Sequence, residues 1–165
     1  MQLDYSLQQG LIYGSIFTGY IFILMITLSP RIWGYTDYPE TVKRKVPPQT
    51  RRERTIAGIV SVPFFLFAIA YPAYSVLALR DRLGGVMAFS DAFIHLLMMV
   101  IFMTIGDLVI LDWFIISKVT PGFVVVPGSE VEDYKDFSHH YWGHLRGTII
   151  MIVLCAAVAV IVSRQ

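Results

Sequence analysis

Three ionisable side chains inside one long apolar stretch are the first candidates for chemistry. Residues 90–116 are mostly Leu, Ile, Val, Met and Phe, yet they include His95, Asp107 and Asp112. A helix of about 20 apolar residues crosses a hydrocarbon core. An ionisable group inside that core costs roughly 2.5 to 3.5 kcal/mol. Such side chains must face protein, water or a ligand, so Asp107 and Asp112 are candidate catalytic carboxylates.

A second group of polar residues precedes the last apolar segment. In DFSHHYWGHLRG, the residues Asp136, His140 and His144 recur every fourth position and would share one face of a helix. Two histidines four residues apart can bind one metal ion. Asp112 would complete a nitrogen and oxygen set suited to zinc, iron or manganese. The spacing therefore predicts a divalent transition metal held by His140, His144 and Asp112.

A metal-free alternative explains the same residues by local pairing. Asp107 and Asp112 would then pair with Arg146 or with an arginine of the 31–54 loop. The two carboxylates are five residues apart, about 140° around an α-helix, so we expect them to face different neighbours. Asp107, nearest the middle of the span, would be a proton carrier or a ligand anchor. His95 is expected to bond with Asp91, one turn earlier, and to lie outside the site.

Four apolar segments must position these side chains. The chain has 165 residues, of which 56% are hydrophobic, and a mean hydropathy of +0.63. Soluble domains are about 45 to 50% apolar. We therefore predict one membrane domain, an all-α antiparallel four-helix transmembrane bundle. The predicted spans are about 6–28, 55–79, 90–116 and 140–163. Pro63 and Pro72 should bend the second span, with neighbouring groups satisfying the freed carbonyls.

The basic residues predict an orientation. Ten of the 13 lysines and arginines fall in the loops 31–54 and 117–138 or at the start of the last span. The positive-inside rule then places both loops in the cytoplasm and both termini outside. Trp33, Tyr35 and Tyr38 are expected at the lipid headgroups, and residues 123–126 could lie extended on the membrane surface. The aspartates and histidines would gather on the cytoplasmic side.

The basic loop suggests a ligand. Lysines and arginines beside a membrane helix often hold an anionic headgroup or phosphate. The predicted ligand-binding residues are Arg146, Lys43, Arg44, Arg51 and Arg52. The predicted function is binding of a lipid-like or small anionic ligand, as an enzyme or a carrier. The sequence contains no glycine-rich phosphate loop, nucleophile elbow or CxxC motif, so the reaction stays open.

The alternative function is a non-catalytic subunit or assembly partner of a membrane complex. Gly10 with Gly14, and Ser15 with Gly19, have the spacing that lets two membrane helices approach closely. This seam could pack within the chain, against a partner helix or in a homo-oligomer. The near balance of 13 basic and 12 acidic residues gives no indication of nucleic acid binding.

One segment resembles known sequences. The run TPGFVVVPG, the YKD that follows it and a histidine ahead of the final span are similar to a pattern in small bacterial and archaeal multipass membrane proteins. The resemblance covers the last two spans. It implies a bacterial or archaeal plasma membrane and no particular activity.

Overall fold

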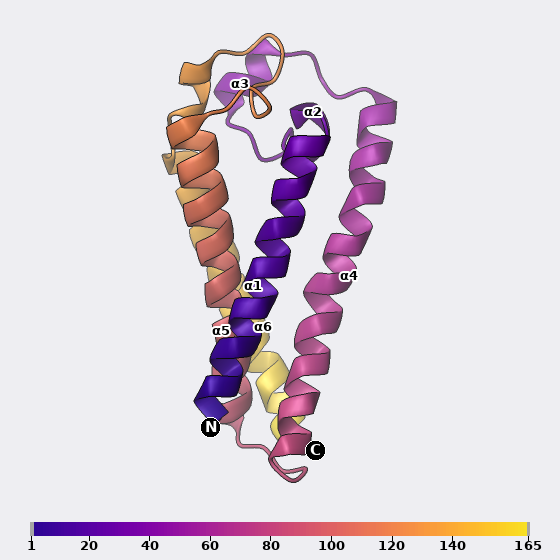
Figure 1. Cartoon of the computed structure of the whole chain (residues 1–165), viewed down its shortest axis with the longest axis vertical. Coiled ribbons are helices and arrows are strands. Elements are labelled where there is room, and N and C mark those ends of the chain that lie inside the picture. The colour runs from indigo at the N-terminus through magenta and orange to yellow at the C-terminus, as the bar shows by residue number, and fades with distance from the viewer. Residues whose placement is uncertain (1, 165) are drawn as a thin grey trace.

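The computed structural model describes residues 2–164, and they form a helical bundle without strands. Figure 1 shows the elongated bundle, with both ends of the chain at the same end of it. Its long elements are α1 (Gln2–Thr27), α4 (Arg51–Arg82), α5 (Phe89–Thr104) continued by η1 (Ile105–Val119), and α6 (Ser138–Ser163). Four helices are long and apolar enough to cross a membrane. The predicted set of four long apolar helices is confirmed.

Local sequence signals explain where the helices begin and end. Pro30 starts the short helix α2 (Pro30–Trp33), because proline suits the first turn and cannot continue α1. Thr50 and Glu53 form a reciprocal capping box at the start of α4. Gly84 and Gly85 have positive φ angles in the tight turn before α5. The remaining short helices are α3 (Glu40–Lys45) and η2 (Val131–Tyr134).

Glycines allow α1 and α5 to pack closely. A Cβ atom on Gly10 would lie 2.8 Å from Phe102 Cδ2, and one on Gly14 would lie 2.8 Å from the Phe102 carbonyl oxygen. Farther along, Gly106 of η1 faces the Thr18 side chain with no room for a Cβ. The Gly10 and Gly14 pair is therefore a packing seam inside this chain. A Cβ on Gly19 would meet nothing within 4 Å.

His95 joins three helices at the end of the bundle that holds the termini. Its Nε2 lies 2.9 Å from Ser75 Oγ on α4, and its Nδ1 lies 3.0 Å from Ser6 Oγ on α1. The ring also stacks on Tyr5 and is fully buried. The expected bond to Asp91 is wrong, because helix packing gives both ring nitrogens partners from other helices. His95 lies outside the candidate site, as predicted.

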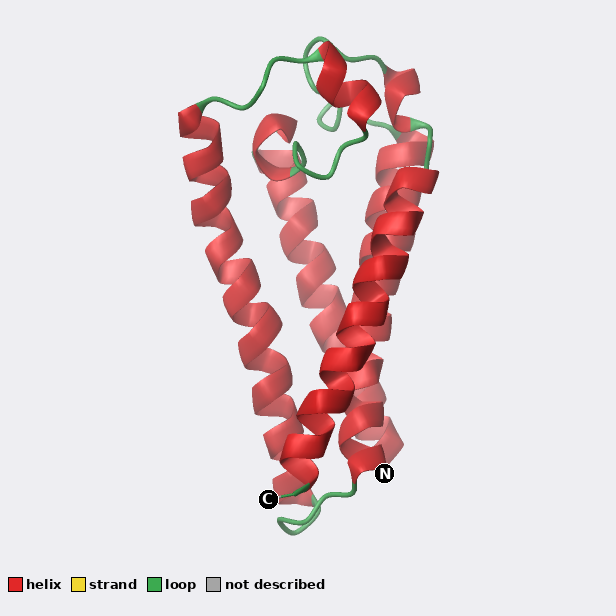
Figure 2. Cartoon of the chain, turned by 180° about the vertical axis from the view of Figure 1, so that it is seen from behind, coloured by secondary structure: helices red, strands yellow, loops and turns green. Residues whose placement is uncertain are grey.

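Helix α4 contacts α1 and α5 but diverges from α6 toward the long loops (Figure 2). Its buried residues are confined to its last turns, at Ser75, Val76 and Leu79. The Tyr13 hydroxyl of α1 donates to the carbonyl of Ala68, which is the carbonyl that Pro72 leaves free. In Figure 2, α6 in front and α4 beside it meet at the bottom and diverge toward the long loops. The bundle is therefore a wedge, open at the loop end.

The two long loops pack together over the open end. The Tyr38 hydroxyl donates to the Val124 carbonyl at 2.9 Å, and the Val126 amide donates to the Tyr134 hydroxyl at 2.9 Å. Tyr38, Val124, Val126 and Tyr134 are all buried. Tyr38 was expected to face the lipid headgroups and residues 123–126 to lie extended, whereas Tyr38, Val124 and Val126 are buried between the loops and residues 122–124 form a turn. These side chains pack against each other because each loop supplies an apolar face.

Candidate functional site

The π-helix η1 brings the two aspartates together. In a π-helix each N–H bonds to the carbonyl five residues earlier, so residues five apart lie on nearly the same face. The end of η1 shows this pattern, with the Thr120 amide donating to the Ile115 carbonyl at 2.8 Å. Asp107 and Asp112 therefore lie on one face. The prediction that they face different neighbours is wrong, because it assumed the α-helical repeat.

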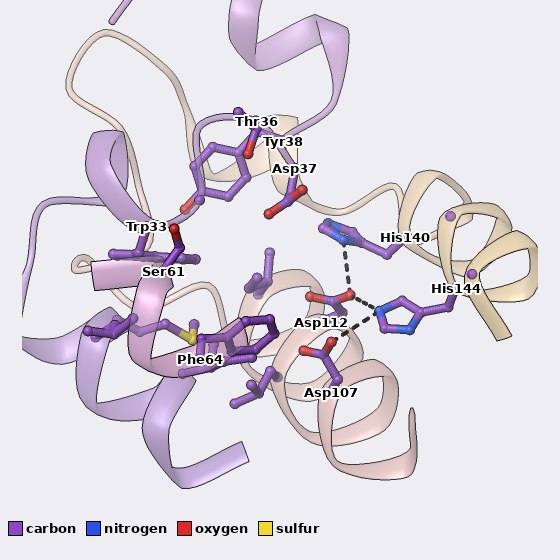
Figure 3. A pocket seen from close by; sticks show the side chains of 18 of the residues that line it. Trp33, Thr36, Asp37, Tyr38, Ser61, Phe64, Asp107, Asp112, His140 and His144 are labelled. Atoms are coloured by element: carbon purple, nitrogen blue, oxygen red, sulfur yellow. Dashed lines mark hydrogen bonds and ion pairs between the residues drawn. The ribbon is translucent and has the colours of Figure 1, made fainter. Parts of the chain in front are cut away.

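Two histidines of α6 meet these carboxylates (Figure 3). His144 Nε2 lies 2.9 Å from Asp112 Oδ2 and 3.8 Å from Asp107 Oδ2. His140 Nδ1 lies 3.2 Å from the same Asp112 oxygen. The histidines are one helical turn apart, so both reach the same face of η1. His140 is buried, while the other three side chains are partly open to the pocket beside them.

A large pocket lies beside this cluster. Its volume is about 950 Å³, and α1, α4, η1, α6 and residues 32–38 all contribute to its wall. The polar lining is concentrated in three aspartates and three histidines: Asp37, Asp107, Asp112, His139, His140 and His144. Apolar and small residues such as Phe64, Phe65, Gly143 and Gly147 form the side between α4 and α6. The pocket therefore has one polar end and one apolar side.

Asp37 lines the pocket and was not predicted from the sequence, whereas His139, which also lines it, is one of the histidines expected on this side. Figure 3 shows Asp37 entering from the loop toward His140 and Asp112. The Asp37 side chain is exposed, and it faces the pocket, whose walls are formed by several helices. Its pKa is raised above the usual value, first by the loss of hydration and second by the Asp112 charge, with His140 opposing. No sequence pattern links a loop aspartate to two distant helices.

The predicted basic residues lie elsewhere. Among the described residues, no lysine or arginine lines the large pocket. Lys43 donates to the Thr36 carbonyl at 2.8 Å, while Arg44, Arg51 and Arg52 are exposed on the loop side.

Arg146 likewise does not line the pocket that holds Asp107 and Asp112. It is exposed and borders a second cavity of about 600 Å³, which also has Glu132, Asp133 and Asp136 in its wall. The alternative in which Asp107 and Asp112 pair with an arginine does not match this structure, where both carboxylates lie against histidines of α6.

The cluster has the composition of a metal or acid–base site. Ligand atoms of Asp107, Asp112 and His144 all lie within 4.8 Å of one another. Two of these residues belong to the predicted metal set, and Asp107 joins them where the sequence predicted His140. An imidazole bonded to a carboxylate can also accept and return a proton at a bound molecule.

Comparison with known proteins gives no relative from which to transfer a role. No protein-family model matches the chain, and neither a curated protein nor a solved structure matches it. Function must therefore be argued from the chemistry of the site, because a helical bundle by itself does not specify one.

Proposed function

We propose that this protein is an integral membrane protein that binds a lipid-like molecule in the large pocket and places its polar end against Asp112, His140 and His144. The observation that carries the proposal is the pocket itself, which combines an aspartate–histidine cluster with an apolar side. Binding pockets of this size with a few convergent polar groups are the usual form of a small-molecule site. The carboxylate–imidazole pairs suit proton transfer at the polar end, which is enzyme chemistry.

The location within the membrane supports a lipid-like ligand. The four apolar helices and the excess of basic residues on the loop side favour a bundle that spans the bilayer with both long loops in the cytoplasm. The cluster then lies in the cytoplasmic half of the bilayer. A ligand there must tolerate hydrocarbon around most of its length.

The gap between α4 and α6 supports entry from the side. Phe65 on α4 and Ile150 on α6 both line the pocket and are 59% and 60% exposed. In a bilayer, these surfaces would contact acyl chains instead of water. An apolar tail can therefore enter between the two helices without crossing a polar barrier.

The charges in the pocket favour a particular polar end. Three aspartates and three histidines line the space with no described lysine or arginine, so the pocket offers an anion no permanently charged cationic partner. A hydroxyl or amine can donate to the carboxylates, and a metal ion could bridge them to a more acidic group. Of the lipid-like and small anionic ligands predicted from the sequence, we therefore favour a lipid-like ligand whose polar end is neutral or cationic.

The test fills the pocket without disturbing the fold. Gly147 lines the pocket, and a Cβ there would meet no atom within 4 Å. Gly19 has equally open space but lies outside the pocket lining, so Gly19→Leu is the matched control. Native mass spectrometry of protein purified in mild detergent should show a bound lipid in the wild-type protein and in Gly19→Leu. We expect Gly147→Leu to retain at least about tenfold less lipid, a loss of about 1.4 kcal/mol in binding.

Two outcomes would contradict the proposal. One is equal lipid retention by Gly147→Leu and Gly19→Leu when both are folded by circular dichroism. The other is a wild-type protein that carries no lipid but a stoichiometric partner protein, which would favour the role of an assembly subunit.

A further inference from the structure

We infer that Asp107, Asp112 and His144 bind one divalent transition metal ion, and that His140 positions Asp112 for it. The inference rests on the same pocket as the proposed function, because the ion would lie at the polar end of that space. The sequence predicted His140, His144 and Asp112 as the metal ligands. The set inferred from the structure contains Asp107 in place of His140, and His140 supports Asp112 instead of binding the ion.

The distances are close to those of an occupied site. Two atoms bound to one ion at about 2.1 Å each lie at most about 4 Å apart. The three candidate ligand atoms lie within 4.8 Å of one another, so small side-chain rotations would complete the set. His144 Nε2 already faces both carboxylates, at 2.9 and 3.8 Å. The π-helical repeat of η1 supplies the two oxygens from one face.

The charge balance also favours a cation. Asp107, Asp112 and Asp37 all line one pocket inside an apolar bundle, without a lysine or arginine among the described lining residues. Carboxylates in a membrane interior are costly, and here two histidines serve both Asp107 and Asp112. A divalent ion would neutralise two of the charges and would leave a binding position open toward the pocket.

His140 has the position of a supporting residue. Its Nδ1 lies 3.2 Å from Asp112 Oδ2, and its side chain is buried. Groups that hydrogen-bond to a ligating carboxylate fix its orientation, and their loss typically weakens metal affinity about 10- to 100-fold. One imidazole with two carboxylates suits zinc, manganese or iron. A bound ion would polarise an oxygen at the polar end of the ligand.

The experiment measures metal binding directly on the full chain in detergent. Protein is stripped with a chelator and titrated with Zn²⁺, Mn²⁺ and Co²⁺ by calorimetry, with the Co²⁺ absorption spectrum as a second readout. We expect one ion per chain in the wild-type protein. Asp107→Asn and His144→Ala should lose stoichiometric binding. His140→Ala should bind about 10- to 100-fold more weakly, and His140→Asn, which keeps a donor, should recover part of that loss.

His139→Ala is the matched control, because His139 lines the same pocket one residue away but contributes no atom to the cluster. It should bind metal as the wild-type protein does. The inference is overturned if the wild-type protein binds no ion, or if Asp107→Asn and His144→Ala bind as tightly as wild type. Normal affinity in His140→Ala would overturn the role given to His140.

A further measurement does not depend on the variants. Metal should raise the melting temperature of the stripped wild-type protein, since a ligand that binds only the folded state stabilises it. An unchanged melting temperature at saturating metal would count against the site. Lipid retention is measured on the same stripped sample. A protein that retains lipid but binds no metal would contradict only the metal inference, and one that binds metal but retains no lipid would contradict only the lipid proposal.

Discussion

Both ring nitrogens of His95 are bonded to serine hydroxyls of other helices, and this predicts a large effect of replacing it. We expect His95→Leu to lower the free energy of unfolding by about 2 to 4 kcal/mol, because the Ser6 and Ser75 hydroxyls lose a buried partner. Reversible unfolding in mixed detergent measures the change. Ile94→Ala, at a neighbouring residue that is 40% exposed, is the control and should cost under about 1 kcal/mol. Equal effects of the two changes would disprove this role of His95.

Single residues show why the sequence predicts types of side chain better than their partners. The sequence identifies His95, Asp107 and Asp112 as polar groups inside an apolar run, because composition alone reveals them. The partners of His95 lie 20 and 89 residues away, and only the packed bundle brings them together. Asp37 was missed for the same reason, since its neighbours Asp112 and His140 belong to distant helices.

Helix packing between α1 and α5 gives a prediction at the scale of the elements. We expect Gly14→Leu to destabilise the protein by about 1 to 3 kcal/mol or more, because the new side chain would meet the Phe102 backbone at 2.7 to 2.8 Å. A backbone cannot move aside as a flexible side chain can. Thermal unfolding in detergent measures the loss, and Gly19→Leu, which has open space, should be near wild type.

The effect of Gly14→Leu on the monomer distinguishes packing within the chain from packing between chains. If Gly14→Leu leaves the monomer as stable as wild type but releases a bound partner, then the seam serves assembly between chains. The close approach to Phe102 instead predicts that the monomer itself is weakened.

The elements themselves were largely predictable, but the type of one helix was not. Four apolar runs with proline, glycine and capping residues at their ends predict four long helices, and the structure has them. The π-helical repeat of η1 has no such signal, because its sequence is as apolar as an ordinary α-helix. The prediction that Asp107 and Asp112 face different neighbours assumed an α-helical repeat, and it was wrong for that reason.

The orientation of the whole molecule can be tested by chemical labelling. We expect a membrane-impermeant maleimide to label Val86→Cys on intact cells, because Val86 is 82% exposed in the turn between α4 and α5. Glu132→Cys, in the opposite loop, should be labelled only after lysis if that loop is cytoplasmic. The unchanged chain is the blank, since its single cysteine, Cys155, is buried. Labelling of Glu132→Cys before lysis would reverse the orientation.

The packing of the two long loops against each other could not be predicted from the sequence. Tyr38 and Val124 bond across 86 residues, and no local pattern specifies that pairing. From the sequence, residues 123–126 are expected on the membrane surface and the aromatic residues of the 31–54 loop at the headgroups, and no contact between the two loops is predicted. In the structure they bury an apolar cluster above the pocket.

The wedge between α4 and α6 has a consequence for selectivity. Among the described residues, α4 and α6 share a buried cluster near Val76, at the end away from Phe65 and Ile150, and no buried residue of α4 lies near those two side chains. A thicker, branched or longer hydrocarbon would therefore meet little steric penalty there. The aspartate–histidine end, in contrast, has fixed distances. If the pocket binds a lipid-like molecule as proposed, we expect it to select ligands by their polar end and to bind acyl chains of different length with similar affinity.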